Sequence, residues 1–127
     1  MTKEFVTYNQ ALALKELGFD EPCFDYYNPI EHKLNIFGVV NSELDFNKAW
    51  IPAPLYQQAF RWFREKHQIE AIVSCIYSKT LDISYEERRY HCYIVRDGIT
   101  TKGIKFKTYE GAEEACLEKL IEICKNK

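Results

Sequence analysis

The stretch that decides the fold is residues 89–124, which read RYHCYIVRDG ITTKGIKFKT YEGAEEACLE KLIEIC. Its first eight residues alternate with a period of two, which is typical of a half-buried β-strand. Asp97 and Gly98 form a turn signal, and residues 103–107 then alternate again. The last sixteen residues carry apolar side chains at helical spacing, and Thr108 precedes them as an N-cap. The stretch therefore predicts strands over 89–96 and 103–107 and a helix over 109–124.

A second helix is predicted near the start of the chain, over residues 8–17. Thr7 is a favoured N-cap residue, and Gln10 three positions later completes a capping box. Gly18 follows the last residue of this segment, and glycine commonly ends a helix because it adopts the left-handed conformation.

A third helix is predicted over residues 54–66. Pro54 suits the first helical position, where no backbone N–H is needed. The apolar side chains that follow recur at i, i+3, i+4 and i+7, and they are Tyr56, Ala59, Phe60 and Phe63. This spacing predicts an amphipathic helix.

The remaining predicted elements are a hairpin and one long strand, over residues 23–27, 34–39 and 69–78. Residues 41–53 are predicted to be a loop, and residues 79–88 either a long connection or an extension of the flanking strands. The order α-β-β-α-β-β-β-α predicts a single α+β domain over residues 1–127. In this fold a mainly antiparallel sheet of about five strands packs against two or three helices.

Composition limits the classes of function. The net charge is −2, from 17 basic and 19 acidic residues, which argues against a general nucleic-acid binder but leaves room for a local basic patch. The first residues lack the apolar core of a signal peptide, and no apolar run approaches the ~20 residues that span a bilayer. We therefore expect a cytoplasmic protein, whose five cysteines are free, reduced thiols.

No local motif proposes catalysis, a metal or a cofactor. The cysteines form no C-x-x-C pair, and the histidines show no H-x-x-x-H spacing. Cys75, Cys92 and Cys116 fall on predicted core faces, where a free cysteine acts as a small apolar side chain. We predict no catalytic residue, no metal ligand and no cofactor. An enzyme or small-molecule site assembled only in three dimensions stays open.

Two surfaces are candidates for binding. Arg61, Trp62 and Arg64 lie together on the predicted helix 54–66, and Trp and Arg are favoured interface residues, although Trp62 on such a helix also suits the core. A basic sheet face is the second candidate, and it consists of Arg88, Arg89, Arg96, Lys105 and Lys107. Tyr90 and Tyr93 nearby suit stacking on nucleic-acid bases.

Three blocks resemble a known family: ALALKELGFDEPCF at 11–24, APLYQQAFRWFREKH at 53–67 and TYEGAEEACLEKLIEI at 108–123. They are similar to a family of small uncharacterised proteins encoded by phages and prophages of gut Bacteroidota. The resemblance implies a phage or mobile-element accessory protein in a bacterial cytoplasm, and it carries over no catalytic residue.

The leading hypothesis is a non-enzymatic accessory protein that acts by protein–protein interaction. Its partner is an unidentified protein, and a second copy of the chain, forming a homodimer, is among the candidates. A nucleic-acid-binding module that uses the basic sheet face is the alternative, and no membrane partner is expected.

Overall fold

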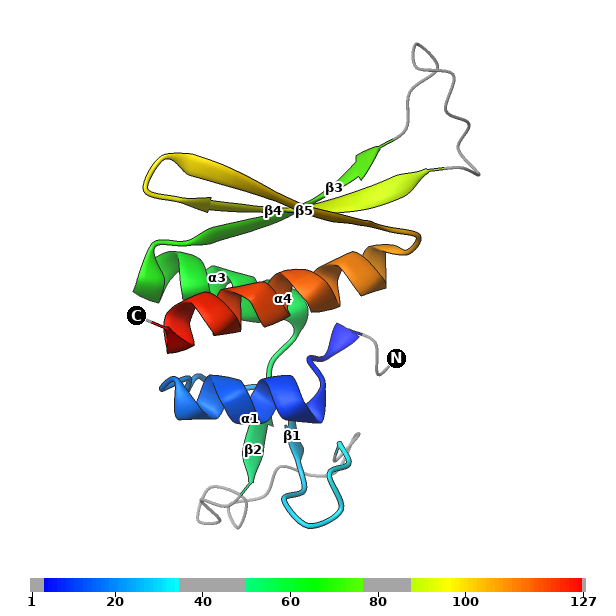
Figure 1. Ribbon diagram of the computed structural model, residues 1–127. Helices are drawn as coiled ribbons and strands as arrows, with labels where there is room; N and C mark the ends of the chain where they lie inside the picture. The colour runs from blue at the N-terminus through cyan, green and yellow to red at the C-terminus, as the bar shows by residue number, and fades with distance from the viewer. Residues whose placement is uncertain (1–3, 35–49, 77–87, 127) are drawn as a thin grey trace. The chain divides into compact units, whose positions relative to one another are not determined.

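The structure is a computed structural model, and it describes residues 4–34, 50–76 and 88–126 (Figure 1). Within these residues, three helices and five strands follow in the order α1-β1-β2-α3-β3-β4-β5-α4. Every strand pair in the described part is antiparallel, which confirms the predicted α+β class. The chain divides into two compact units, Met1–Ala59 and Phe60–Lys127. The prediction of one domain over residues 1–127 stays a prediction.

The first helix, α1, spans Tyr8–Glu16 and is capped as predicted. The Thr7 hydroxyl accepts a hydrogen bond from the Gln10 N–H at 3.2 Å, and the Gln10 side-chain oxygen accepts one from the Thr7 N–H at 3.0 Å. Two of the orphan donors at the helix start are thereby satisfied. Leu17 is the C-cap, and Gly18 follows with φ +103°, a conformation that favours glycine.

The Gln10 side chain is the polar centre of the first unit. It is 1% exposed, and its oxygen also accepts a hydrogen bond from the Tyr56 hydroxyl at 2.9 Å. The Tyr27 hydroxyl donates to the Val6 carbonyl at 2.6 Å. Buried polar groups need such partners, because an unpaired one costs about 1–3 kcal/mol. The buried apolar side chains of this unit include Val6, Ala11, Leu14, Phe19, Ile51 and Ala53.

The small sheet of the first unit corrects one prediction. Strand β1, Asp25–Tyr27, pairs with β2, Ile51–Ala53. Tyr27 of β1 also forms an isolated antiparallel bridge with Leu34, the first residue of the predicted strand 34–39, and the rest of that predicted strand lies outside the described residues. The end of the predicted loop 41–53 is thus a strand. Proline within a short segment argues against a strand, because it has no N–H to donate. Pro52 pairs with Tyr26 in a sheet of only two strands, and an edge strand tolerates proline.

The start of α3 also differs from its prediction. The helix spans Tyr56–His67, so Pro54 does not occupy its first turn. The Pro54 carbonyl accepts a hydrogen bond from the Val6 N–H at 3.0 Å, and Leu55 forms an antiparallel bridge with Phe5. These contacts hold the two residues in extended conformation, and nothing in the local sequence indicates them.

In the second unit, three strands form an antiparallel sheet in the order β3-β4-β5. They span Glu70–Ile76, Arg89–Arg96 and Ile99–Phe106. The final helix, α4, spans Tyr109–Lys125 and contacts all three strands. Figure 1 shows α3 and α4 on the same side of this sheet. In β4 the alternation therefore places Cys92 and Ile94 toward α4 and His91 on the opposite face.

The β4–β5 hairpin has a two-residue turn, which explains why β5 begins earlier than predicted. Asp97 and Gly98 have φ of +53° and +76°, as the turn that best joins twisted antiparallel strands requires. Ile99 then pairs directly with Arg96, and the strand continues through residues that precede its predicted start. A two-residue turn leaves no loop between the strands, so residues 99–102 enter the sheet.

Gly103 allows β5 to approach β4 closely. The register shifts between His91 and Tyr93, so β5 carries an extra residue opposite this point. A Cβ atom at Gly103 would lie 3.2 Å from the Cys92 carbonyl oxygen. Any side chain here would push β5 away from its partner, so glycine fits this irregularity.

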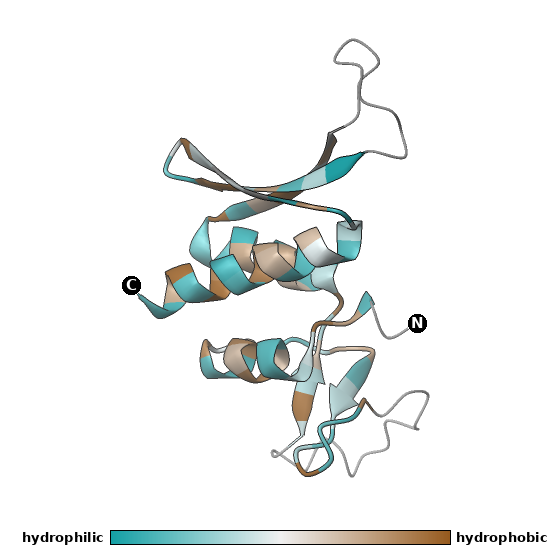
Figure 2. Ribbon diagram, turned by 45° about the vertical axis from the view of Figure 1, so that its right-hand side comes forward, coloured by the Kyte–Doolittle hydropathy of each residue, from teal (hydrophilic) through white to brown (hydrophobic). Residues whose placement is uncertain are grey.

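The helix α4 is built as its sequence predicts. The Thr108 hydroxyl accepts a hydrogen bond from the Gly111 N–H at 3.0 Å. Figure 2 shows hydrophobic and hydrophilic residues alternating along the ribbon of α4. Its buried side chains are spaced by three and four positions, and they include Ala112, Cys116, Leu117, Leu120, Ile121 and Cys124. One face of the helix therefore packs on the sheet, and the other face is polar.

Replacing the buried hydrogen-bond partners in the first unit tests its polar centre. We expect Tyr56→Phe to lower the free energy of unfolding by about 1 kcal/mol, and Gln10→Leu by about 2–3 kcal/mol. The second change is larger because it leaves the Tyr56 hydroxyl without this acceptor and removes half of the capping box. Chemical denaturation measures both. Tyr26→Phe, on a half-buried tyrosine, is the control, and equal losses in Tyr56→Phe and this control would contradict the account.

Candidate functional site: a groove between the β4–β5 hairpin and α4

The structure separates the members of the first predicted surface. Arg61 and Arg64 are exposed, whereas Trp62 is only 4% exposed. The Trp62 ring packs edge-on against Phe63 and against His67, with ring centres 5.1 and 5.0 Å apart. Trp62 therefore belongs to the core, as the alternative noted for this helix predicts, and not to the candidate binding surface. The two arginines that remain do not form an aromatic-anchored interface.

The predicted basic face is divided between the two ends of the hairpin. Arg89 and Lys105 lie on the sheet face away from α4, because Lys105 pairs with His91, two residues from Arg89. Arg96 lies at the other end of β4, about 23 Å away for seven residues of strand, and on the face toward α4. The structure therefore brings Arg89 and Lys105 together but not Arg96.

The other two basic residues lie near the first end of the hairpin. The Arg88 Nε donates a hydrogen bond to the Tyr90 hydroxyl at 3.0 Å, and the Arg89 guanidinium donates to the Arg88 carbonyl at 2.9 Å. Lys107 is exposed directly after β5. This end of the hairpin is therefore a basic corner, defined here by Arg88, Arg89, Lys105 and Lys107.

Two cysteines are bonded, which corrects the prediction of five free thiols. Cys92 in β4 and Cys116 in α4 form a disulfide whose Cα atoms are 5.6 Å apart. Both residues were predicted to face the core, and both are buried. Their spacing of 24 residues carries no motif, so only the packing of α4 on the sheet brings them together. The bond fixes the centre of α4 to the middle strand.

The three other cysteines are not disulfide-bonded. Cys75 is exposed, and Cys124 is buried. Burial, together with the smaller effect of the neighbouring Glu21 carboxylate, raises the pKa of the Cys23 thiol to about 12. Since the thiolate is the nucleophile, a thiol with this pKa is almost entirely protonated near neutral pH. Cys23 is therefore a structural residue in this environment.

The described residues form neither a metal site nor a membrane span. In residues 4–34, 50–76 and 88–126, no three His, Cys, Asp or Glu side chains lie together as a metal site requires. No helix in these ranges is long and apolar enough to cross a membrane. The remaining candidate is therefore a cavity.

A groove opens between the β4–β5 hairpin and α4, beside the disulfide. Its larger part has a volume of about 350 Å³. The lining residues are contributed by β4, β5 and α4, and they are Cys92, Ile94, Thr101, Gly103, Phe106, Ala115 and Lys119. Most of these surfaces are apolar, with a hydroxyl from Thr101 and an ammonium from Lys119. Pockets of this volume and composition are typical of ligand and peptide sites.

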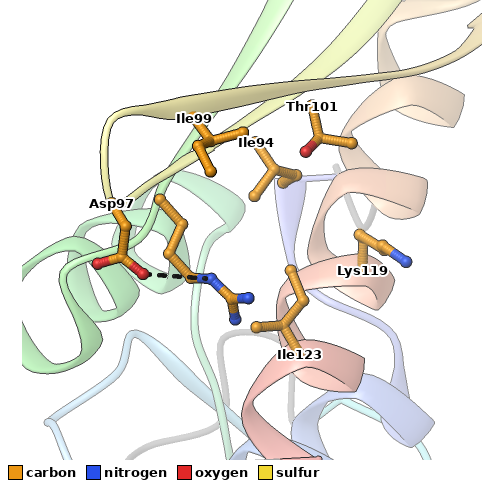
Figure 3. Close-up of a pocket in the computed structure, with 7 residues that line it drawn as sticks. Ile94, Asp97, Ile99, Thr101, Lys119 and Ile123 are labelled. Atoms are coloured by element: carbon orange, nitrogen blue, oxygen red, sulfur yellow. Dashed lines mark ion pairs between the residues drawn. The ribbon is translucent and has the colours of Figure 1, made fainter.

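The groove continues toward the hairpin turn as a smaller cavity of about 140 Å³. Ile94, Thr101 and Lys119 line both parts, so the two cavities adjoin each other. Figure 3 shows that Ile94 and Ile99 extend from the hairpin into this space, and that Ile123 extends toward them from α4. Ile99 is 67% exposed, which is unusual for an isoleucine in a strand. We call the whole feature the hairpin–helix groove.

The charges at the rim of the groove are weakly engaged. The Arg96 guanidinium lies 3.9 Å from the Asp97 carboxylate, and the Lys119 ammonium lies 3.6 Å from the Glu122 carboxylate. All four side chains are about half exposed or more. Exposed pairs of this kind contribute only about 0–1 kcal/mol, because water screens them. Arg96 and Lys119 can therefore leave these carboxylates and bind an anionic ligand at a small cost in free energy.

The lining of the groove is mainly apolar and cationic. Asp97 is the one carboxylate among the lining residues in the described part of the chain, and it is 88% exposed at the outer end. General acid–base catalysis needs a titratable group within hydrogen-bond reach of the reacting atoms, usually in a desolvated site. The lining instead offers apolar contacts and two cations.

This groove was not predicted from the sequence, because the predicted strand begins at residue 103 and so leaves out Ile99 and Thr101. The alternation that reveals it is present, since Ile99, Thr101 and Gly103 are every second residue. These side chains share the face toward α4, and the small size of the last two leaves space there.

Removing the disulfide tests whether it holds α4 on the sheet. Closing a loop of this length stabilises a fold by about 3 kcal/mol. We expect the double variant Cys92→Ala/Cys116→Ala to lose about that much free energy of unfolding, and dithiothreitol to destabilise the wild type but not the variant. The exposed Cys75→Ser is the matched control, expected to change stability by less than about 0.5 kcal/mol. Equal sensitivity of both proteins to the reductant would contradict the assignment.

Comparison of the chain with protein-family models, with curated proteins and with solved structures finds no match. The geometry of the groove therefore carries the functional argument.

Proposed function

We propose that this chain is a non-enzymatic interaction protein that holds a segment of a partner protein in the hairpin–helix groove. The observation that carries the proposal is the groove itself, an open apolar cavity of about 350 Å³ with an exposed isoleucine beside it. Apolar surface that stays accessible to water is a common mark of an interaction site. Docked apolar side chains are stabilised by about 25 cal/mol for each Å² removed from water.

The resemblance noted from residues 11–24, 53–67 and 108–123 supplies the proposed setting. We take the protein as a phage or mobile-element accessory protein that acts in a bacterial cytoplasm. The partner is then a host or phage protein, or a second copy of this chain. The cavity also has the size of a small-molecule site, so small-molecule binding is one outcome that the tests must separate.

One observation favours a second candidate function, nucleic-acid binding. Arg88, Arg89, Lys105 and Lys107 gather at the basic corner, and Tyr90 lies beside them through its bond to Arg88. A cationic corner next to an aromatic ring suits a phosphate backbone with a stacked base. The first turn of α4 nearby contains Glu110, and its acidic charge repels phosphate. The groove therefore stays the leading site.

Two neighbouring threonines provide a matched test of the groove. Thr101 lines the cavity, whereas Thr100 pairs with Val95 and is exposed on the opposite face. We expect Thr101→Trp to fill the groove and to reduce recovery of the partner from a Bacteroidota lysate by about tenfold, equivalent to 1.4 kcal/mol. Thr100→Trp adds the same side chain to the same strand, and we expect it to leave recovery unchanged.

The measurement is quantitative mass spectrometry of proteins that tagged wild type and both variants retain after nuclease treatment. Thermal unfolding of each variant checks that it is folded. If the Thr101→Trp variant retains the partner protein as well as the wild type does, the proposed site is contradicted. Material that is lost on nuclease treatment and on Arg89→Glu/Lys105→Glu would instead support the basic corner.

The proposed cytoplasmic setting makes a separate prediction for the disulfide. A reducing cytoplasm opposes disulfides, but thiol attack requires access to the sulfur atoms. Cys92 and Cys116 are at most 5% exposed, so we expect their bond to persist in the cell. Acid quenching of cells followed by denaturation and a maleimide-polyethylene-glycol reagent should modify three cysteines. Modification of all five would show that the pair is reduced in that compartment.

A further inference from the structure

The charge of this chain is strongly segregated. Six of its 17 basic residues, but one of its 19 acidic residues, lie between positions 88 and 107. The β4–β5 hairpin and its two flanks therefore carry a net charge of +5, although the whole chain carries −2. A local field of one sign attracts ligands of the opposite sign and speeds their association. The strand that borders the groove thus lies in a strongly cationic part of the sequence.

The outer edge of β5 is open within the described residues. In the three-stranded sheet, β5 pairs with β4 on one side, and no strand in the described ranges pairs with its other side. Backbone N–H and C=O groups along such an edge are ready to pair with another extended chain. Adding a peptide strand to an edge is a common mode of recognition, in which backbone bonds provide affinity.

The edge and the groove belong to one surface. Ile99, Thr101 and Gly103 of β5 line the groove, so a strand added to β5 runs directly beside the cavity. Successive side chains of a strand point to opposite faces. Every second side chain of the incoming strand then projects toward α4 and enters the apolar space, beside Ile94 and Ile123.

Charged side chains near the outer edge of β5 favour an acidic ligand. Arg96 and Lys119 stand at the rim of the groove, and their exposed pairs with Asp97 and Glu122 are weak. On the outer face, Lys105 is exposed on the same strand. An added strand with carboxylates therefore meets cations on both of its faces, whereas a basic strand is repelled.

We infer that the hairpin–helix groove and the outer edge of β5 together bind an extended, acidic segment of a partner protein, with apolar side chains at every second position. This inference rests on the proposed function and specifies the conformation and the charge of the docked segment. A helical segment would place its apolar side chains at intervals of three and four, and it would leave the backbone groups of β5 unpaired.

Selection from a library of random decapeptides tests the inference while the partner is still unidentified. Peptides are selected on the wild-type chain and removed by passage over the folded Thr101→Trp variant. We expect the selected sequences to be rich in Asp and Glu and to carry apolar residues with a period of two. Individual peptides should bind at least about tenfold more weakly when proline replaces a residue whose N–H would pair with β5, because proline has no N–H to donate.

Two matched variants of α4 test the role of charge. Lys119→Glu changes the rim of the groove, and Lys125→Glu makes the same change at an exposed site in the last turn of the same helix. We expect the first to weaken binding of a selected peptide by at least about fivefold and the second by less than about twofold, as steering by local charge predicts.

The outcomes separate this inference from the proposed function. Selected peptides with helical spacing, or without acidic enrichment, would overturn the inference while leaving the groove as a docking site. Failure to select any peptide that depends on Thr101 would overturn both. The third outcome is that a 20-nucleotide single-stranded DNA binds more tightly than the selected peptides do. If this binding is lost in Arg89→Glu/Lys105→Glu and retained in Thr101→Trp, the cationic hairpin is assigned to nucleic acid. That result would overturn the acidic-peptide inference.

Discussion

The contact between α4 and the middle strand β4 is the constraint on which the second unit depends. Cys92 and Cys116 join the two elements covalently, and the apolar face of α4 covers the strands around this bond. The bond holds the helix at its centre, and the groove opens beside it over Thr101 and Gly103, two small residues of the neighbouring strand. The groove is therefore a consequence of one fixed contact beside a strand segment of small residues. A helix that packed evenly along β5 would leave no cavity there.

Local signals are sufficient for the elements that stabilise themselves. The Thr7–Gln10 capping box predicts the start of α1, and the period-two pattern of residues 89–96 predicts β4 with the observed bounds. Elements that depend on distant partners are not predictable in this way. β2 exists because β1 lies beside it, and α3 begins late because Pro54 bonds to Val6. Neither contact can be predicted from the residues that lie next to it in the sequence.

The candidate site is predictable only in part, for the same reason. The basic residues of the hairpin are identified from the sequence, because charge depends only on residue type. Their division between two ends and two faces of the sheet depends on the register of β4 and β5, which the sequence does not give. Residue type suggests a surface role for Trp62, whereas its burial against Phe63 depends on packing. The disulfide joins residues 24 positions apart without a motif, and the groove needs the distance between a strand and a helix.

Apolar lining, a cationic rim and an open strand edge occur on one surface in the described part of the second unit, and together they support the proposed peptide site. The most direct measurement is site-specific photo-crosslinking in living bacterial cells, with benzoylphenylalanine placed at Thr101 or at Thr100. The account predicts a covalent adduct with a discrete protein from position 101 and none from position 100, because these side chains lie on opposite faces of β5. Equal adducts from both positions, or an adduct from position 100 alone, would contradict the groove as the binding site.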